Sequence, residues 1–280
     1  MAGSLNLVRI SATSTTPPGI RRTETVTKYI DTTSCIGCKA CEVACQQWND
    51  LPPEATVQFG TYQTMPDLTP GFWNLIRFEE TEVAGTQAWL MRKDQCMHCG
   101  DPGCLAACPS PHAIVQYSNG IVDFNQEHCI GCGYCITGCP FNIPKLSKST
   151  AKVYKCTLCV DRVSVGLEPA CIKACPTGCL QFGSKTQVLH VADKRVEQLK
   201  TNGFPNAMVY DPEGVGGTGV VTVLAHGDRL ESYGLPRNPT IPLAVTLWKK
   251  PLKWLGSLGM IAGVLVAGLH YLKFGPKEDK

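Results

Sequence analysis

The sequence predicts an α+β protein with a cysteine-rich domain, a small α/β appendage and one C-terminal transmembrane helix. Three observations lead to this prediction. The 280 residues include 17 cysteines, which are concentrated between positions 35 and 179 in a region also dense in glycine and proline. Longer helix and strand patterns come after this region. Residues 254–272 then form an uncharged apolar run near the C-terminus.

Sixteen of the cysteines fall into four groups of four. The groups are Cys35, Cys38, Cys41 and Cys45; Cys96, Cys99, Cys104 and Cys108; Cys129, Cys132, Cys135 and Cys139; and Cys156, Cys159, Cys171 and Cys175. The first and third groups have the spacing C-x2-C-x2-C-x3-C, which is the bacterial ferredoxin pattern. Proline follows the last cysteine of the other three groups, whereas Gln46 follows in group one.

This spacing has a physical basis. Three cysteines at two-residue gaps allow one tight loop to bind three corners of an iron–sulfur cube, and the fourth cysteine then binds another cluster. Gly37, Gly131 and Gly133 permit the backbone angles that such loops need. The sequence therefore predicts four [4Fe-4S] clusters in two ferredoxin-like two-cluster modules. Spacing does not decide between nested and sequential pairing of the groups, but a hairpin between Cys108 and Cys129 favours pairing groups two and three.

Other uses of the cysteines are weaker predictions. The fourth group alone has the spacing of a zinc ribbon, but tetrahedral zinc rarely takes three cysteines as close together as those of groups one and three. Disulfides are disfavoured because cysteines at two-residue gaps make strained partners and the total is odd. Cys179 is left over. We interpret it as a small buried apolar residue, with a redox or ligand-exchange role as the alternative.

Composition and termini restrict the remaining functions. The net charge of +3 predicts no nucleic-acid partner. No apolar stretch occurs in residues 1–19 or directly after Arg21-Arg22, so neither a general secretion signal nor a twin-arginine signal is predicted. Cluster assembly needs reduced thiolates, so folding is expected in the cytoplasm. No acid–base pair or nucleophile has catalytic spacing, and the chain is expected to transfer electrons without a catalytic site of its own.

Local patterns predict six strands and one soluble helix. The strands are residues 73–80, 87–93, 114–117, 121–124, 207–210 and 220–225. The first four form two hairpins, and Asn119-Gly120 is a strong signal for the second turn. Residues 186–201 predict an amphipathic helix that ends before Gly203, with an apolar face formed by Val188, Val191, Val196 and Leu199.

The apolar run at residues 254–272 spans about 28 Å as a helix, close to the thickness of a bilayer core. Trp254 and Tyr271 near its ends are typical of an interfacial aromatic belt. Three lysines flank each end, which argues against a buried core helix and gives no orientation. The predicted regions are an N-terminal extension (1–25), the double ferredoxin-like domain (26–185), an α+β appendage with a linker (186–247) and the anchor with a short tail (248–280).

Three further signals are discounted. Gly214, Gly216 and Gly219 match a dinucleotide fingerprint, but a strand and not a helix is predicted after them. His270 lies near the end of the transmembrane run, where a headgroup position is favoured over a haem ligand. His98 is expected to pack against a cluster or donate a hydrogen bond to it.

The cysteine motifs resemble the four-cluster subunits of molybdopterin oxidoreductases, and above all the iron–sulfur beta subunit of membrane-bound formate dehydrogenase of the N or O type. The resemblance covers nearly the whole chain and is most specific over residues 29–183. It rests on Cys35-Ile36-Gly37-Cys38-Lys39-Ala40-Cys41, Cys129-Ile130-Gly131-Cys132-Gly133-Tyr134-Cys135, Tyr154-Lys155-Cys156-Thr157-Leu158-Cys159, Gly138-Cys139-Pro140-Phe141-Asn142-Ile143-Pro144 and Pro212-Glu213-Gly214-Val215-Gly216-Gly217-Thr218.

The resemblance implies a nested arrangement of ligands, in four sets. Set one is Cys35, Cys38, Cys41 and Cys175; set two is Cys45, Cys156, Cys159 and Cys171; set three is Cys96, Cys99, Cys104 and Cys139; set four is Cys108, Cys129, Cys132 and Cys135. All sixteen positions are cysteine, unlike the nitrate reductase relative, which has a non-cysteine ligand at one site.

The resemblance also implies partners and a location. A molybdenum or tungsten molybdopterin alpha subunit would oxidise formate, and a cytochrome b gamma subunit would take the electrons to quinone in anaerobic respiration. The expected assembly is a heterotrimer or a higher oligomer of it. The soluble domain would be periplasmic, on a single-pass anchor in the inner membrane, exported with the alpha subunit. Rival functions are the same subunit of a hydrogenase or sulfur-compound reductase, or a zinc-bound structural tether.

Overall fold

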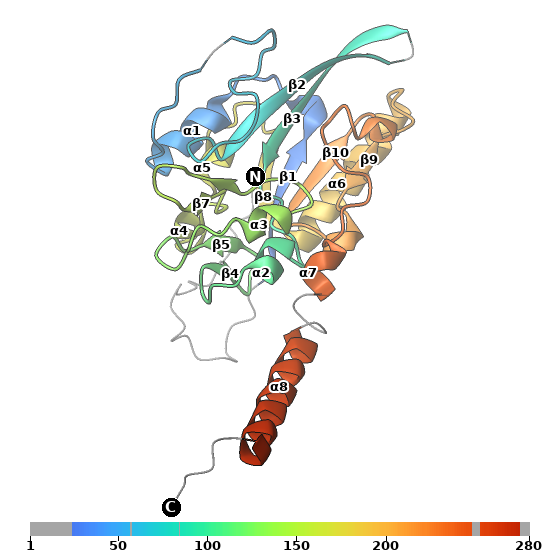
Figure 1. The fold of residues 1–280 in the computed structure, drawn as a ribbon. Coiled ribbons are helices and arrows are strands. Elements are labelled where there is room, and N and C mark those ends of the chain that lie inside the picture. The colour runs from blue at the N-terminus through green and yellow to red at the C-terminus, as the bar shows by residue number, and fades with distance from the viewer. Residues whose placement is uncertain (1–23, 57, 84, 248–252, 275–280) are drawn as a thin grey trace, which may run out of the picture.

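A four-stranded sheet forms the centre of the molecule. The computed structural model describes residues 24–56, 58–83, 85–247 and 253–274. The sheet has the order β8-β1-β10-β9, formed by β1 (Val26–Asp31), β8 (Leu180–Ser184), β9 (Met208–Tyr210) and β10 (Val220–Leu224) (Figure 1). β1 pairs antiparallel with β8 and parallel with β10. The sheet therefore joins strands from both sides of the predicted boundary at residue 185.

One face of the sheet is covered by helix α6 (Lys185–Thr201), which starts where Ser184 accepts a hydrogen bond from the amide of Gln187. The sequence predicted this helix and strands β9 and β10, and all three are confirmed. The predicted apolar face was wrong at one position. Val191 is 45% exposed, because the buried stripe runs through Ala192 instead, four residues after Val188.

The other face of the sheet covers the cysteine-rich region. Its short helices are α1 (Ala40–Trp48), α2 (Gly103–Ala107), α3 (Tyr134–Thr137), α4 (Val160–Val163) and α5 (Ala170–Lys173). Helix α1 packs against α5, and α2 packs against α3. The two helix pairs form two ferredoxin-like modules, as the sequence predicted. The first module contains α1 and α5, and the second contains α2 and α3, which lie between them in the sequence. The first module is therefore built from two segments that are far apart in the chain.

Three two-stranded ribbons complete the soluble part. They are β2 (Asn74–Val83) with β3 (Thr86–Gln95), β4 (Ile114–Gln116) with β5 (Val122–Phe124), and β6 (Lys145–Leu146) with β7 (Val153–Tyr154). The first two confirm the predicted hairpins. Short 3-10 turns occur at η1 (Thr32–Ser34), η2 (Glu213–Val215) and η3 (Gly227–Arg229).

The glycine-rich segment at residues 214–219 holds a cysteine loop in place. The amides of Gly100 and Asp101 donate to the carbonyls of Gly217 and Val215 at 2.9 and 2.7 Å. A Cβ atom on Gly100 would overlap the carbonyl oxygen of Gly216, so glycine is required for this approach. Strand β10 follows the segment, as predicted. The fingerprint therefore shapes a backbone contact beside Cys99, and no helix follows it to hold a phosphate.

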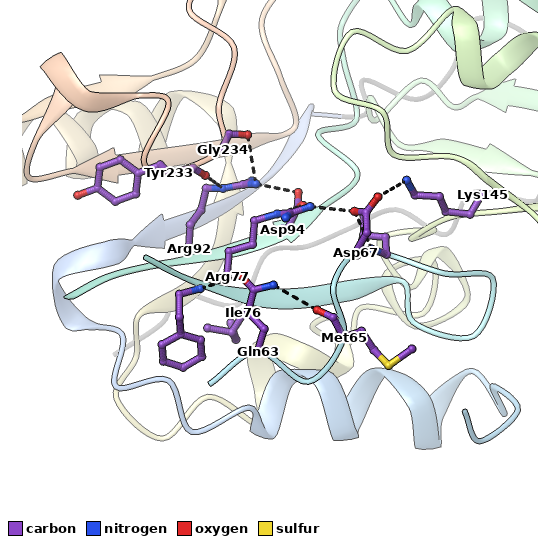
Figure 2. A network of polar contacts seen from close by, with 12 residues as sticks. Gln63, Met65, Asp67, Ile76, Arg77, Arg92, Asp94, Lys145, Tyr233 and Gly234 are labelled. Carbon is purple, nitrogen blue, oxygen red and sulfur yellow. Dashed lines mark hydrogen bonds and ion pairs between the residues drawn. The ribbon is translucent and has the colours of Figure 1, made fainter. Parts of the chain in front are cut away.

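A polar network fixes the long hairpin to the domain (Figure 2). Asp94 on β3 forms ion pairs with Arg77 on β2, at 2.5 Å, and with Arg92, at 3.0 Å. Asp67 joins Arg77 at 2.8 Å and Lys145 of β6 at 2.7 Å. The network thus ties β2 and β3 to the segment before them and to the second module.

We expect Asp94→Asn to destabilise the chain by about 3 kcal/mol. Arg92 and Asp94 are 5% and 7% exposed in their side chains, and removing one charge of a buried pair leaves the other uncompensated. Arg92 keeps its bonds to the carbonyls of Tyr233 and Gly234, which hold the side chain in place but do not neutralise it. The measurement is the denaturant midpoint for loss of visible absorption in the purified complex. Asp228→Asn, at an exposed pair, is the control and should leave the midpoint unchanged.

The C-terminal region is a separate helix. Helix α7 (Leu243–Leu247) packs against α2, and α8 (Lys253–Phe274) projects away from the domain (Figure 1). Within it, Trp254–Tyr271 is long and apolar enough to cross a membrane, with a mean hydropathy of 1.4 and no buried residues. The exposure of this apolar surface is that of a membrane helix and not of a core helix. His270 lies near its end, with its ring 5.0 Å from that of Phe274.

Candidate iron–sulfur sites

The four cysteine loops share one backbone feature. In each loop, the second residue after the first cysteine adopts a left-handed conformation: Gly37 at φ 65°, His98 at 48°, Gly131 at 71° and Leu158 at 54°. Gly133, the other predicted glycine, is also left-handed, at 75°. A non-glycine residue in this region costs on the order of 1–3 kcal/mol, so His98 and Leu158 are held there by their surroundings. The loops are therefore four copies of one local structure.

The left-handed residues turn their amides toward sulfur. The amides of His98 and Leu158 each donate to the sulfur of the first cysteine of their loop, Cys96 and Cys156, at 3.4 Å. The amide of Gly37 makes the equivalent bond to Cys35, which helps to lower the pKa of that thiol. Successive amides that point to one side form a nest for an anion. The loops are thus built to stabilise thiolates.

Two cavities in the first module are lined by cysteines. One is bordered by all of set one, Cys35, Cys38, Cys41 and Cys175, together with Cys179. The other is bordered by all of set two, Cys45, Cys156, Cys159 and Cys171. Each cavity thus combines three cysteines from one segment with a fourth from a segment more than a hundred residues away.

In the second module, the thiols that raise one another's pKa fall into two groups. Burial raises the pKa of the Cys99 thiol, and the nearby thiols of Cys96, Cys139 and Cys104 raise it further. These four are the members of set three. Burial likewise raises the pKa of Cys135 to about 12, and the thiols of Cys108, Cys129 and Cys132, the other members of set four, raise it further.

The donors fit iron–sulfur clusters. Buried thiols that raise one another's pKa become thiolates when a cationic centre compensates their charge. Two buried nitrogens, Nε2 of His98 and Nε2 of Gln95, have no hydrogen-bond partner, and cluster sulfurs would be acceptors of the kind they need. No three His, Cys, Asp or Glu side chains within the described residues converge on a single metal ion.

His98 is held as a neutral imidazole. Its Nδ1 accepts a hydrogen bond from the amide of Val122 at 3.1 Å, which leaves its proton on Nε2. The side chain is 2% exposed, and burial keeps its pKa well below the usual value. His98 is therefore a buried donor beside Cys96 and Cys99, and its expected hydrogen bond to a cluster stays a prediction.

Cys179 is more closely involved than a packing residue. It is 3% exposed and lies at the wall of the set-one cavity. Its thiol is hydrogen-bonded to Cys35, and this bond lowers the pKa of Cys35 to about 6 while it raises that of Cys179. Cys179 therefore stays protonated as the donor and Cys35 carries the charge.

The structure adds three buried lysines that sequence reasoning missed. Lys28, Lys93 and Lys155 are 0%, 4% and 2% exposed. Burial alone would lower the pKa of Lys28 and Lys155, but the charges of nearby cysteines raise both above the usual value. The available signal for Lys28 was its position between the apolar residues Val26 and Tyr29.

The four sets are connected in one order. Lys93 lines the cavities of both set one and set two. Cys96 of set three and Cys156 of set two lie in one buried cluster of side chains. Cys104 of set three lies in another buried cluster with Cys129 and Cys135 of set four.

Comparison with known proteins identifies the family. Residues 34–112 and 87–185 each match a 4Fe-4S dicluster domain, and residues 241–280 match the transmembrane region of formate dehydrogenase N. The nitrate-inducible formate dehydrogenase iron–sulfur subunit of Escherichia coli K12 is 55% identical over 278 residues, which cover 98% of this chain and 95% of the relative. This chain belongs to the formate dehydrogenase iron–sulfur subunits.

Two other members of the family are similarly close. The formate dehydrogenase iron–sulfur subunit of Haemophilus influenzae is 51% identical over 280 residues, covering 98% of this chain and 90% of the relative. The formate dehydrogenase-O iron–sulfur subunit of Escherichia coli K12 is 51% identical over 279 residues, covering 98% and 93%. The chain is thus a membrane-anchored electron-transfer subunit, and its two dicluster domains account for the four predicted [4Fe-4S] clusters. When bound, these clusters accept and release single electrons.

Proposed function

We propose that this chain carries electrons from formate, oxidised by a molybdopterin alpha subunit, to a cytochrome b gamma subunit in the membrane. The names of its relatives support formate as the electron source. The observation that carries the proposal is that the four cysteine sets lie next to one another in a series, from set one to set four, inside one chain. No residue of the chain needs to bind formate or quinone for this role.

The ligands in this proposal are the four sets defined above. The two cysteine-lined cavities support sets one and two, because each is bordered by one complete set. The mutual effects of the thiols around Cys99 and Cys135 support sets three and four. The packing of α1 on α5 and of α2 on α3 supports the same nesting.

The two ends of the series support a direction of transfer. Among the cysteines, all of which lie in the described residues, Cys38 of set one and Cys132 of set four are the exposed ones. Each lies beside an exposed apolar residue, Ile36 at 61% and Ile130 at 66%. Helix α2 contains Cys104 of set three and is capped by Cys108 of set four, and it packs against α7, which leads to α8. Because set four is the end of the series on this side, it is proposed as the membrane end. Electrons would then arrive at set one.

The sidedness of the protein is also part of the proposal. The domain would be periplasmic, with α8 anchored in the inner membrane and the folded chain exported with its alpha subunit. The expected assembly contains alpha, beta and gamma subunits in equal numbers. The same series of clusters would serve a hydrogenase or a sulfur-compound reductase. Mass spectrometry of the alpha subunit that co-purifies from membranes distinguishes these alternatives.

Two surface variants test the direction. Ile36→Glu places a charge on the apolar surface beside Cys38, so formate should no longer reduce the clusters, as measured by electron paramagnetic resonance. Ile130→Glu does the same beside Cys132, so formate should still reduce the clusters while quinone reduction falls at least tenfold.

These variants are matched in size, exposure and charge, so each is the control for the other. The reverse pattern would place the accepting end at set four. Normal reduction of clusters and quinone in both variants would contradict the assignment of the two ends.

A further inference from the structure

Two buried lysines meet at one oxygen atom. Lys28 of β1 and Lys93 of β3 each donate a hydrogen bond from Nζ to Oε1 of Gln95, both at 2.8 Å. Lys28 also donates to Sγ of Cys171 at 3.2 Å. Gln95 is fully buried, as is Lys28. The single acceptor holds two ammonium groups close together in the interior.

This pair lies between the first two cysteine cavities. Lys93 lines the cavities of set one and set two, and Lys28 lines the cavity of set two. Lys28 reaches this position because alternate residues of β1 face opposite ways. Tyr29 packs with α6, and Lys28 and Ile30 face the cysteines. Lys93 comes from the hairpin that covers the other side.

The ammonium pair lies outside the ion pairs formed in the described part of the chain. Within the described residues, neither lysine forms an ion pair with aspartate or glutamate. Two like charges this close in a low-dielectric interior are strongly unfavourable unless an anion compensates them. The thiolates of sets one and two supply negative charge at this place, since Sγ of Cys171 in set two lies 3.2 Å from Nζ of Lys28.

We infer that Lys28 and Lys93, joined by Gln95, act as a fixed positive charge that raises the reduction potentials of the clusters in sets one and two. The inference rests on the proposed ligand sets. A thiolate-bound cluster becomes more negative when it takes up an electron, and a nearby positive charge favours that reduced state. The pair therefore lowers the energy of an electron on either of the two clusters.

The test replaces Lys93 by methionine, which keeps the length and removes the charge. In the complex purified from membranes, a redox titration followed by electron paramagnetic resonance measures each cluster. At the wild-type midpoint of the affected clusters, the ratio of reduced to oxidised cluster should fall about tenfold, which is about 59 mV for one electron. Lys93→Arg keeps the charge and should restore the wild-type ratio.

Gln95→Glu tests the same idea with little change in packing. The carboxylate keeps an acceptor for both lysines and neutralises one of the two charges, so the ratio should fall in the same direction. Lys194→Met is the control. Lys194 is exposed on α6, on the face of the sheet opposite the cysteines, and its loss should leave all midpoints unchanged.

The outcomes separate this inference from the ligand assignment. Wild-type midpoints in Lys93→Met and Gln95→Glu, with full iron content, would overturn the inference and leave the ligand sets intact. A wild-type complex without signals from four clusters would overturn the ligand sets. If Lys93→Met fails to assemble, Lys93→Gln, which keeps a polar group and removes the charge, decides: a lowered ratio supports the inference and an unchanged ratio refutes it.

Discussion

Replacing Cys175 with alanine should remove one cluster, so that iron falls from about sixteen to about twelve atoms per chain. Cys175 is the proposed distant ligand of set one and lies at the same cavity as Cys35, Cys38 and Cys41. Alanine offers no thiolate, and three ligands leave one corner of the cube open to water. The measurement is iron per chain in the purified complex, together with loss of the corresponding paramagnetic signal.

Cys179→Ala is the matched control. Cys179 borders the same cavity, but its protonated thiol donates to Cys35 and is not a ligand in set one. Iron should stay at about sixteen atoms per chain. Loss of the donor should lower the potential of that cluster, because hydrogen bonds to the ligand sulfurs stabilise the reduced state.

The pair also tests ligand exchange. If Cys179 can take the place of Cys175, then Cys175→Ala keeps its iron and only the double variant loses a cluster. That result would contradict the assignment of Cys175 as the sole fourth ligand. Loss of iron in Cys179→Ala alone would reverse the roles of the two residues.

Ending the chain after Leu247 should release nearly all of it from membranes in an alkaline carbonate wash. The deletion removes α8, whose apolar span Trp254–Tyr271 is exposed along its length. Such a span partitions into a bilayer far more strongly than surface attachment does. The carbonate wash strips proteins held by contacts with other proteins, so it isolates the contribution of the helix.

A chain that ends after Phe274 is the control, because it keeps α8 and loses only the charged tail. It should remain in the washed membranes. Retention of the shorter chain after the same wash would mean that α8 is not the anchor.

Part of the candidate site was predictable because it is local. The loops around Gly37 and Gly131 need left-handed residues, and glycine in a ferredoxin spacing indicates them directly. His98 and Leu158 adopt the same conformation without glycine, and only the equivalent cysteine spacing indicated it. The long hairpin and α6 were also predictable, since turn residues and periodicity are short-range signals.

Other parts depend on contacts between distant segments. Strand β1 was not predicted, since Lys28 and Thr27 interrupt its apolar pattern, yet both are buried because the sheet is covered on both faces. Val191 was assigned to the buried face of α6 and is exposed, since the outline of the partner sheet decides where the buried stripe ends.

By itself, the sequence determined the sixteen cysteines in four groups, the number and type of clusters, and the membrane helix. These follow from spacing and from the length of an apolar run, which are properties of short segments. Only the tertiary structure brought Cys175 to the cavity of Cys35, and Lys28 and Lys93 to one oxygen of Gln95. The physical reason is that burial and charge compensation are set by residues far apart in the chain, which folding alone brings together.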